Sequence, residues 1–322
     1  MNRKWLFFIL RIVIGLSVLY FVIIKVNFLD IYYALVNPLR PGFIVFSLFL
    51  LIPNLLLQWH RWHYLLKLIK PDIHYKNSFE SLMGGMVVGF ITPGRLGEVG
   101  RPLFLFDIDR LQAAGLVFID KFYSFITILV GGIWGLTFII YYQFNYRSFI
   151  LYPLLLISFI ITGLGLIICF YPSGIRKMLY NISLIFPYRD NLKRFITCLD
   201  NFHNKEARIF LFYSFLMYGI YILQFCFLAL AFQRMHFSTA ASSTIATIFT
   251  KTLLPFSFAD LGIREGAAVY FFVKFGIQKV TAFNSAILLF AINVLLPTCI
   301  GFIFLPKLGN NDRKSNKRKN KN

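Results

Sequence analysis

Two short stretches of this sequence place acidic and basic residues together inside strongly apolar surroundings. The first is TPGRLGEVGR, Thr92 to Arg101, and the second is LPFSFADLGIRE, Leu254 to Glu265. A guanidinium group is planar and matches the oxygens of a phosphate or carboxylate with two parallel hydrogen bonds. The chemistry that these residue types favour is therefore the holding of an anion.

In the first stretch, Arg95, Glu98 and Arg101 follow one another at intervals of three residues. On a helix these residues form one slanting stripe. Glu98 can then pair with one arginine on each side, which leaves a net positive charge. Gly94 and Gly97 allow a close approach to the backbone, beside helix N–H groups that favour anions. We predict that the stripe contributes to a substrate-binding site.

In the second stretch, Asp260 and Arg264 lie four residues apart, which is a pairing distance on a helix. Aromatic residues flank both stretches, and a ligand with an anionic head and an apolar tail fits these surroundings best. The residues predicted to bind substrate here are Lys251, Asp260, Arg264 and Glu265.

Charge inside a bilayer costs about 2.5–3.5 kcal/mol per residue on insertion scales, so it persists where it faces a cavity, a partner or a transport pathway. An Arg–Glu pair can also be purely structural and tie a bent segment together without touching substrate. Two such clusters, at corresponding places in the chain, favour the functional interpretation.

The composition places this chain in a membrane. It has 322 residues, of which 58% are hydrophobic and only 14% are charged, and its mean hydropathy is +0.69. These values exclude an ordinary soluble domain. The four cysteines are scattered singly, which indicates neither a disulfide framework nor a zinc site.

A helix needs about 20 apolar residues to cross a hydrocarbon core about 30 Å thick. The first apolar run carries Arg11 and lacks a small-residue cleavage site, so we interpret it as a retained signal anchor. The predicted fold is an all-α polytopic membrane protein with six full spans, at about residues 5–25, 41–58, 118–140, 149–171, 209–232 and 281–305.

Two further apolar regions, 80–114 and 240–278, are interrupted in the middle by the two charged stretches. Each half is too short to span a membrane alone, which is typical of re-entrant segments. Non-helical backbone at membrane depth must be enclosed by protein or line a wet cavity. We predict two re-entrant helical hairpins, and counting each hairpin as one span gives eight spans. If each hairpin is instead two tilted full spans, the parity and the inversion of the two halves are unchanged.

Basic residues concentrate in one set of loops, whereas the opposite loops hold Arg40, Arg147 and Arg234. By the positive-inside rule, both termini are then cytoplasmic. The basic set includes Arg3, Lys4, Arg61, Lys67, Lys70, Lys76, Arg176, Lys177, Arg189, Lys193, Arg194, Lys205, Arg208 and the tail from Lys307 to Lys321.

This orientation makes the two hairpins enter from opposite faces. The order span, span, hairpin, span then occurs twice with inverted topology, an arrangement that marks many secondary transporters. We expect a first half over 1–145, a second half over 146–306 and a basic, disordered cytoplasmic tail over 307–322. The loop 172–208 predicts an amphipathic surface helix, either a connector or a regulatory dock.

The charged stretches also resemble a known family. TPGRLGEVGRPLFL is similar to its PGRxGE…R signature, and LPFSFADLGIREGA to its P…GGxGxRE signature. The family is the flippase-like transmembrane domain of lysylphosphatidylglycerol synthases, which also occurs alone in bacterial proteins. The resemblance covers about residues 5–305. Two departures are Ala259-Asp260 in place of Gly-Gly, and Asp120-Lys121 in place of Glu-Arg.

The resemblance implies a domain that moves a lipid between the leaflets of a bacterial cytoplasmic (inner) membrane. It also implies that Asp120 and Lys121 belong to the substrate-binding site. We expect no synthase domain, because only a short polar tail follows the membrane part.

Two functions remain open. The first is a lipid flippase or transporter, in which the arginines engage a headgroup phosphate while the acidic residues hold the arginines or bind a coupling proton. The second is a non-transporting accessory subunit or scaffold of an envelope glycosyltransferase or lipid-modifying enzyme. Either is compatible with a homo-oligomer or an envelope-enzyme partner.

Other patterns argue against catalysis. His60 and His63 have no third metal ligand nearby. The sequence contains no phosphate-binding loop, HExxH, CxxC or nucleophile-elbow motif. We predict no enzymatic activity, no metal or other cofactor and no nucleic-acid partner.

Overall fold

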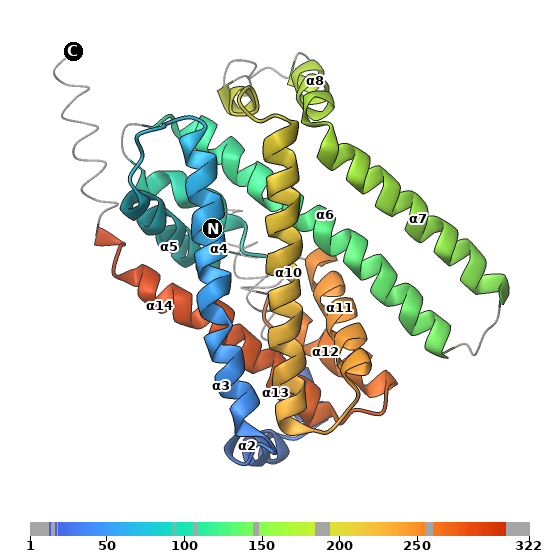
Figure 1. Ribbon diagram of the computed structural model, residues 1–322. Coiled ribbons are helices and arrows are strands. Elements are labelled where there is room, and N and C mark those ends of the chain that lie inside the picture. The colour runs from blue at the N-terminus through green and yellow to red at the C-terminus, as the bar shows by residue number, and fades with distance from the viewer. Residues whose placement is uncertain are drawn as a thin grey trace.

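A computed structural model describes residues 13, 17, 19–92, 94–105, 108–143, 148–183, 194–254 and 260–306. These residues form helices and no strand, which confirms the all-α prediction (Figure 1). The predicted tail over 307–322 and most of the first predicted span lie outside the described residues.

Five of the described helices are long and apolar enough to cross a membrane. Each one matches a predicted span. They are Pro41–Lys67, which joins α3 (Pro41–Phe49) and α4 (Leu51–Lys67); Arg110–Tyr141 in α6 (Arg110–Gln143); Leu151–Phe170 in α7 (Ser148–Phe170); Asn204–Phe232, which is α10; and Lys279–Phe302, which joins α13 (Lys279–Phe290), the π-helical η2 (Ala291–Leu295) and α14 (Leu296–Phe302).

A sixth candidate is a bent pair of helices. The helix Leu19–Val26 meets α2 (Phe28–Val36) at an angle of 79°, with Asn27 between them. Asn27 has a positive φ of 80°, and its side chain accepts a hydrogen bond from the N–H of Leu29. A left-handed residue with a side-chain cap at this point turns the chain by ending one helix and starting the next.

α6 begins at Arg110, earlier than the predicted boundary at 118. Its first turns contain Arg110 and Gln112, which lower the hydropathy of that segment. The same turns also bury Ala113, Leu116 and Val117 in the protein. Tertiary packing on one face therefore extends the helix beyond its apolar stretch.

The first predicted hairpin is formed by α5 (Tyr75–Ile91) and the 3₁₀ helix η1 (Leu96–Phe104). It begins five residues before the predicted start at 80, and its returning arm ends at Phe104 rather than 114. The two arms touch closely because α5 carries Gly84, Gly85 and Gly89 on the facing side. A methyl group at any of these glycines would overlap a side chain of η1.

The second predicted hairpin consists of α11 (Phe237–Leu253) and α12 (Ile263–Lys274). Asp260 and Gly262, with φ of 63° and 82°, turn the chain into α12. The side chain of Glu265 then accepts a hydrogen bond from the N–H of Gly262 at 2.7 Å, which satisfies the first N–H of the turn. Residues 255–259, which include Ala259, lie outside the described residues.

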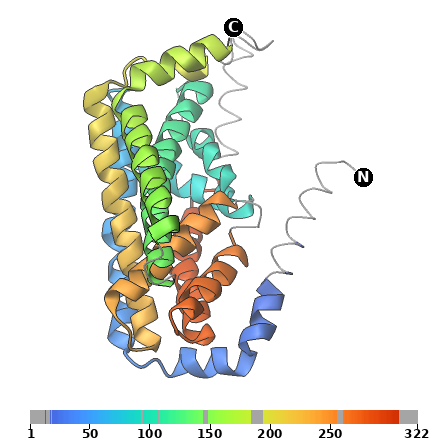
Figure 2. The ribbon, with the colours of Figure 1, turned by 90° about the vertical axis from the view of Figure 1, so that its right-hand side faces the viewer.

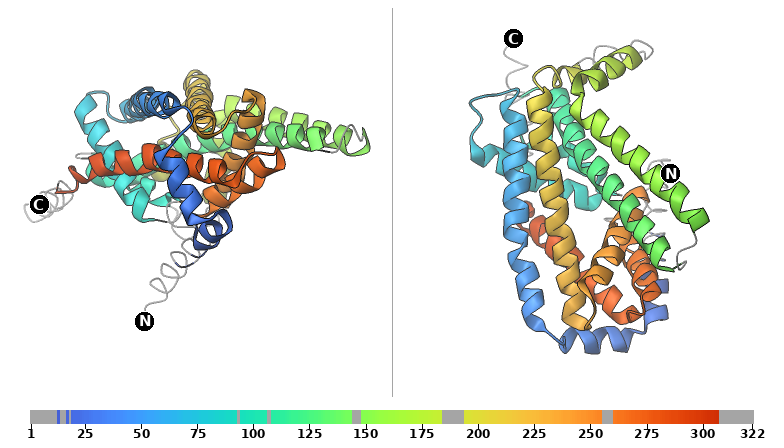
Figure 3. Two further views of the ribbon diagram at one scale, coloured as in Figure 1. Left: turned by 90° about the horizontal axis from the view of Figure 1, so that it is seen from below. Right: turned by 45° about the vertical axis from the view of Figure 1, so that its right-hand side comes forward.

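The hairpins lie toward opposite ends of the long helices (Figures 1 and 3). The α5–η1 hairpin packs near the end that carries α8 (Pro172–Ser183), and the α11–α12 hairpin packs near the end that carries α2. We call these the α8 end and the α2 end. The predicted surface helix over 172–208 is present as α8, which lies across its end of the molecule (Figure 2).

Each hairpin has its own apolar core. Around the first, Trp62, Leu82, Leu116 and Phe210 are fully buried. A second core buries residues of α10, α12 and α13 around the other hairpin: Phe225, Leu228, Ala268, Phe272 and Leu289. The tips of both hairpins then share a small cluster, in which Phe90 and Leu261 pack against Phe290 and Val294 of the last long helix.

Candidate functional site

Charged side chains from three separate elements converge beside the first hairpin. Arg61 comes from α4, Glu98 and Arg101 come from η1, and Asp120 and Lys121 come from α6. Arg95, at the start of η1, completes the group. We call these six residues the first charged cluster. It contains every residue that the sequence predicts for the site from the first half of the chain.

Asp120 joins two arginines from different elements. One carboxylate oxygen lies 2.7 Å from Nε of Arg61, and the other lies 3.0 Å from Nη1 of Arg101. Arg61 also donates to the backbone carbonyl of Asp120, and to Oγ of Ser214 on α10 at 2.9 Å. This carboxylate therefore ties α4, η1 and α6 together.

Glu98 joins three cationic side chains. Its Oε1 lies 2.6 Å from Nη2 of Arg95, its Oε2 lies 2.8 Å from Nη2 of Arg101, and Lys121 also contacts Oε2. The predicted pairing of Glu98 with an arginine on each side is thus confirmed. A 3₁₀ helix makes this easy, because side chains three residues apart eclipse one another when there are three residues per turn.

The members of the cluster differ in exposure. Arg61 is 0% exposed and Arg101 is 2% exposed. By contrast, the side chain of Arg95 is 23% exposed and that of Lys121 is 46% exposed. Only the second pair can reach a ligand without moving, although all four cations lie around the same two carboxylates. Four cations and two carboxylates give the cluster a formal charge of +2.

Aromatic rings help to hold the two buried arginines. The guanidinium carbon of Arg61 lies 5.1 Å from the ring centre of Phe210, and that of Arg101 lies 5.2 Å from the ring centre of Trp62. Such contacts favour a cation whose hydration shell has been removed. Ser81 also accepts a hydrogen bond from Trp62 and donates one to the carbonyl of Arg101. The buried half of the cluster is thereby fixed in place.

Arg95 occupies a special position at the hairpin tip. Its φ is 57°, and Gly94 before it has a φ of 55°, so two successive residues are left-handed. A residue other than glycine adopts this conformation at a cost of about 1–2 kcal/mol. The turn directs the Arg95 side chain back onto Glu98 and places it at the point where the two hairpins meet.

The second hairpin carries a second charged cluster, which consists of Lys251, Asp260, Arg264 and Glu265. Nζ of Lys251 lies 3.2 Å from Asp260, and Nη1 of Arg264 lies 3.8 Å from Glu265. The sequence predicts that Asp260 and Arg264 lie at a pairing distance, and the two side chains do interact electrostatically, although the ion pair that Asp260 makes is with Lys251. Asp260 has a positive φ and precedes α12, which lets its carboxylate reach back to α11.

The two clusters lie close to each other at the hairpin tips. Arg95 lies within electrostatic range of Asp260. Phe90 of the first hairpin stacks on Phe290 with ring centres 6.4 Å apart, and the guanidinium of Arg264 lies 5.2 Å from the same ring. One phenylalanine on the last long helix therefore joins the tips of the two hairpins.

Sequence reasoning missed Arg61 as a member of the site. The charge pattern places Arg61 in a basic loop, yet it is fully buried within the candidate span Pro41–Lys67. A signal was present, because the helical pattern continues past residue 58 through QWHRWHYLLK. A buried polar chain was also missed: Gln58 donates to Asn54, and Asn54 donates to Asn293 in the π-helical turn.

His63 has a structural partner. Its Nδ1 lies 2.6 Å from Oγ of Ser78, and its ring stacks on Tyr75 at 3.7 Å. Within the described ranges, no group of three or more histidine, cysteine, aspartate or glutamate residues could hold a metal ion.

Comparison with known proteins places the chain in a family. A profile of the lysylphosphatidylglycerol synthase transmembrane region matches residues 8–301. A UPF0104 membrane protein of Methanocaldococcus jannaschii is 22% identical over 292 residues, which cover 84% of this chain and 85% of that protein. No solved structure matches the chain. The match spans both hairpins and all five candidate spans, and the chain therefore belongs to the family of the lysylphosphatidylglycerol synthase transmembrane region.

Proposed function

We propose that this protein moves a lipid with an anionic headgroup between the leaflets of a membrane. The observation that carries the proposal is the first charged cluster, which has a formal charge of +2 and exposes Arg95 and Lys121 beside the buried carboxylate of Glu98. A lipid phosphate can replace part of the Glu98 contact with these two cations. The two cations are then shared between a fixed carboxylate and a moving ligand.

The buried residues prepare this arrangement. Arg61, Arg101 and Asp120 hold one another through short contacts, so they stay in place while the exposed pair changes partner. An excess of positive charge in a low-dielectric site attracts an anion more strongly than the same charges would in water. Arg61 and Arg101 supply part of this positive charge from within the protein. Of the nine residues predicted from sequence to bind substrate, we propose that Arg95 and Lys121 contact the lipid and that the other seven hold them in place.

The arrangement of the hairpins supports alternating access. We propose that the chain consists of two inverted halves, that both termini face the cytoplasm, and that the α8 end is the cytoplasmic end of a protein of the bacterial inner membrane. The shared cluster around Phe290 would then lie between the two exits. We also propose that the protein catalyses no reaction, since its part in the process is to carry the headgroup past the apolar core.

A vesicle assay tests this function. The purified chain is reconstituted with fluorescent phosphatidylglycerol, and dithionite reduces the dye in the outer leaflet. Without transport, about half of the signal survives. With the wild-type chain we expect a further decay as labelled lipid reaches the outer leaflet. Arg95→Ala should slow that decay by about tenfold, because a charge-assisted hydrogen bond contributes about 1.5–3 kcal/mol.

Arg176→Ala is the matched control. Arg176 lies on α8 and makes an exposed ion pair with Asp200 at 3.2 Å, so its loss should leave the decay unchanged. Size-exclusion chromatography checks that both variants are folded. If the wild-type chain moves no anionic lipid while Arg95→Ala and wild type co-purify equally with an envelope enzyme, the accessory-subunit function replaces the proposal.

A further inference from the structure

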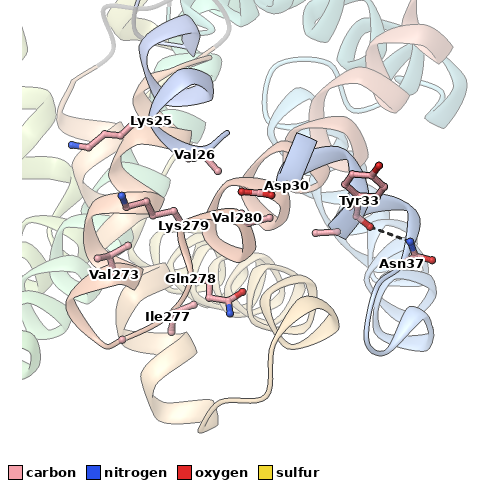
Figure 4. Close-up of a pocket in the computed structure, with 12 residues that line it drawn as sticks. Lys25, Val26, Asp30, Tyr33, Asn37, Val273, Ile277, Gln278, Lys279 and Val280 are labelled. Carbon is pink, nitrogen blue, oxygen red and sulfur yellow. Dashed lines mark hydrogen bonds between the residues drawn. The ribbon is translucent and has the colours of Figure 1, made fainter. Parts of the chain in front are cut away.

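A pocket of about 890 Å³ opens at the α2 end of the molecule, away from both charged clusters. It lies where the bent helix pair packs against the start of α13 (Figure 4). We call it the α2–α13 pocket. Its apolar floor includes Val26, Ile277 and Val280, and its polar rim includes Lys25, Asp30, Asn37 and Lys279.

The surroundings of the pocket are those of a membrane interface. α2 exposes Phe28, Leu29, Tyr32 and Tyr33, each more than half exposed. It also lies across the end of the long helices rather than along them (Figure 2). Exposed tyrosines beside exposed apolar residues are typical of the headgroup level of a bilayer. The segment beside the mouth of the pocket therefore has the composition of the headgroup level of a bilayer.

The rim has the charges that a phospholipid headgroup needs. Lys25 and Lys279 come from different helices, and neither makes an ion pair with any described residue. Nζ of Lys25 lies 5.9 Å from the ring centre of Phe21. Figure 4 shows both lysines on one side of the pocket and Asn37 on the other. Asp30 adds one carboxylate, which can accept a hydrogen bond from a headgroup hydroxyl or ammonium. The rim therefore has one more cation than anion.

We propose that the α2–α13 pocket binds the headgroup of a glycerophospholipid, with the phosphate held by Lys25 and Lys279 and a headgroup donor held by Asp30. The acyl chains extend over the apolar residues that α2 exposes. A soluble phosphate would gain nothing from those residues, so the pocket favours a lipid over a free anion.

The pocket extends the proposed function to a second position along the same helix. α13 begins at the pocket with Lys279 and continues to Phe290, where it meets both hairpin tips. As a place where a transported lipid arrives or leaves, the pocket rests on the proposed function. As a binding site, it can be measured without any transport.

Site-specific photocrosslinking tests the binding. Tyr33 lines the pocket and is 61% exposed, so Tyr33→p-benzoylphenylalanine places a reactive ketone at the rim. The full-length protein in phosphatidylcholine nanodiscs is illuminated with increasing amounts of phosphatidylglycerol, and the lipid adduct is counted by mass spectrometry. Each of Lys25→Gln and Lys279→Gln should raise the lipid concentration for half-maximal adduct by about fivefold, and both together by about 25-fold.

Lys274→Gln is the matched control. Lys274 lies at the same end of the molecule and contacts Tyr270, but it does not line the pocket, so the adduct should not change. An adduct that the double lysine variant leaves unchanged would overturn the proposal. Equal competition by inorganic phosphate and by short-chain phosphatidylglycerol would also overturn it, because the site would then hold any phosphate.

Arg95→Ala separates the two proposals. It should leave the adduct at position 33 intact while it slows transport in vesicles. If transport fails in the wild-type chain but the lysine-dependent adduct forms, the proposed function is wrong and the pocket is a lipid site of another kind. If transport occurs but the lipid concentration for half-maximal adduct does not change in the lysine variants, only the pocket proposal is wrong.

Discussion

The two charged clusters use the same residue types to different ends. In the first, Glu98 and Asp120 bridge α4, η1 and α6, and cations outnumber carboxylates by two. In the second, all four residues belong to one hairpin and the charges balance. The first cluster therefore has an excess of positive charge where three elements meet, whereas the second cluster has no net charge and stabilises a turn.

If the protein transports a lipid as proposed, this difference would separate binding from gating. A neutral pair inside one hairpin changes its surroundings little when the hairpin moves as a unit. A bridge between three elements resists movement, so under the proposed transport function the first cluster would be the fixed side of the site. We infer that the second hairpin is the part that shifts, with Arg264 against Phe290 as the contact that must slide.

The largest expected effect is the loss of the bridge in the first cluster. Asp120→Ala removes the carboxylate that pairs with Arg61 and Arg101, both of which are buried. Leaving buried charge uncompensated costs about 3–5 kcal/mol. We expect the free energy of unfolding in detergent to fall by about this amount, measured by denaturant titration of tryptophan fluorescence.

Asp200→Ala is its matched control. Asp200 is 55% exposed and pairs with Arg176 on the surface, so its loss should cost less than about 1 kcal/mol. A similar small loss for Asp120→Ala would mean that the first cluster is not a structural bridge. The proposed division between a fixed and a moving side would then be wrong.

A middle-sized effect is expected at Glu265, which caps the turn of the second hairpin. Glu265→Ala removes the acceptor of the Gly262 N–H and the carboxylate beside Arg264. A buried donor without a partner costs about 1–3 kcal/mol. Glu265→Gln keeps an oxygen that can accept from Gly262 but removes the carboxylate beside buried Arg264, so only the part of the stability that comes from the cap should return. If the glutamine variant is as unstable as the alanine variant, the charge of Glu265 matters more than its cap.

The contrast between the clusters also explains how far sequence reasoning reaches. Five spans, both hairpins and the pairing within Arg95, Glu98 and Arg101 follow from local patterns of hydropathy and spacing. The contact between Arg61 and Asp120 joins residues 59 positions apart in the chain. Periodicity carries no information about which faces of two helices will meet, so this contact could not be predicted.

The ion pair of Asp260 in the turn before α12 could not be predicted, for a different reason. The spacing of Asp260 and Arg264 implies pairing only if both residues are helical, but Asp260 is left-handed and reaches back to Lys251 on α11. The family signature has glycine at this place, which adopts a positive φ without strain. An aspartate in that position is a departure whose conformation the sequence pattern alone does not reveal.

The smallest effects on stability are expected for the substitutions of Lys121 and Lys251. Because each cluster contributes one of these lysines, the two variants compare the clusters directly. Lys121 is 46% exposed, and Glu98 keeps two arginine partners without it, so Lys121→Gln should cost less than about 1 kcal/mol of stability. The side chain of Lys251 is only 16% exposed, and it is the ion-pair partner of Asp260 within the described residues. Lys251→Gln should therefore cost about 1 kcal/mol more than Lys121→Gln.

The loss of lipid transport should be larger for Lys121→Gln than for Lys251→Gln, which is the reverse of their order in loss of stability. Lys121→Gln removes a cation that can reach the headgroup, so it should slow the dithionite decay even though the fold is unharmed. Lys251→Gln weakens a neutral turn and should change the decay less, once the amount of folded protein is equal. If instead both variants lose transport in proportion to stability, neither lysine touches the lipid, and the excess charge of the first cluster only holds the fold together.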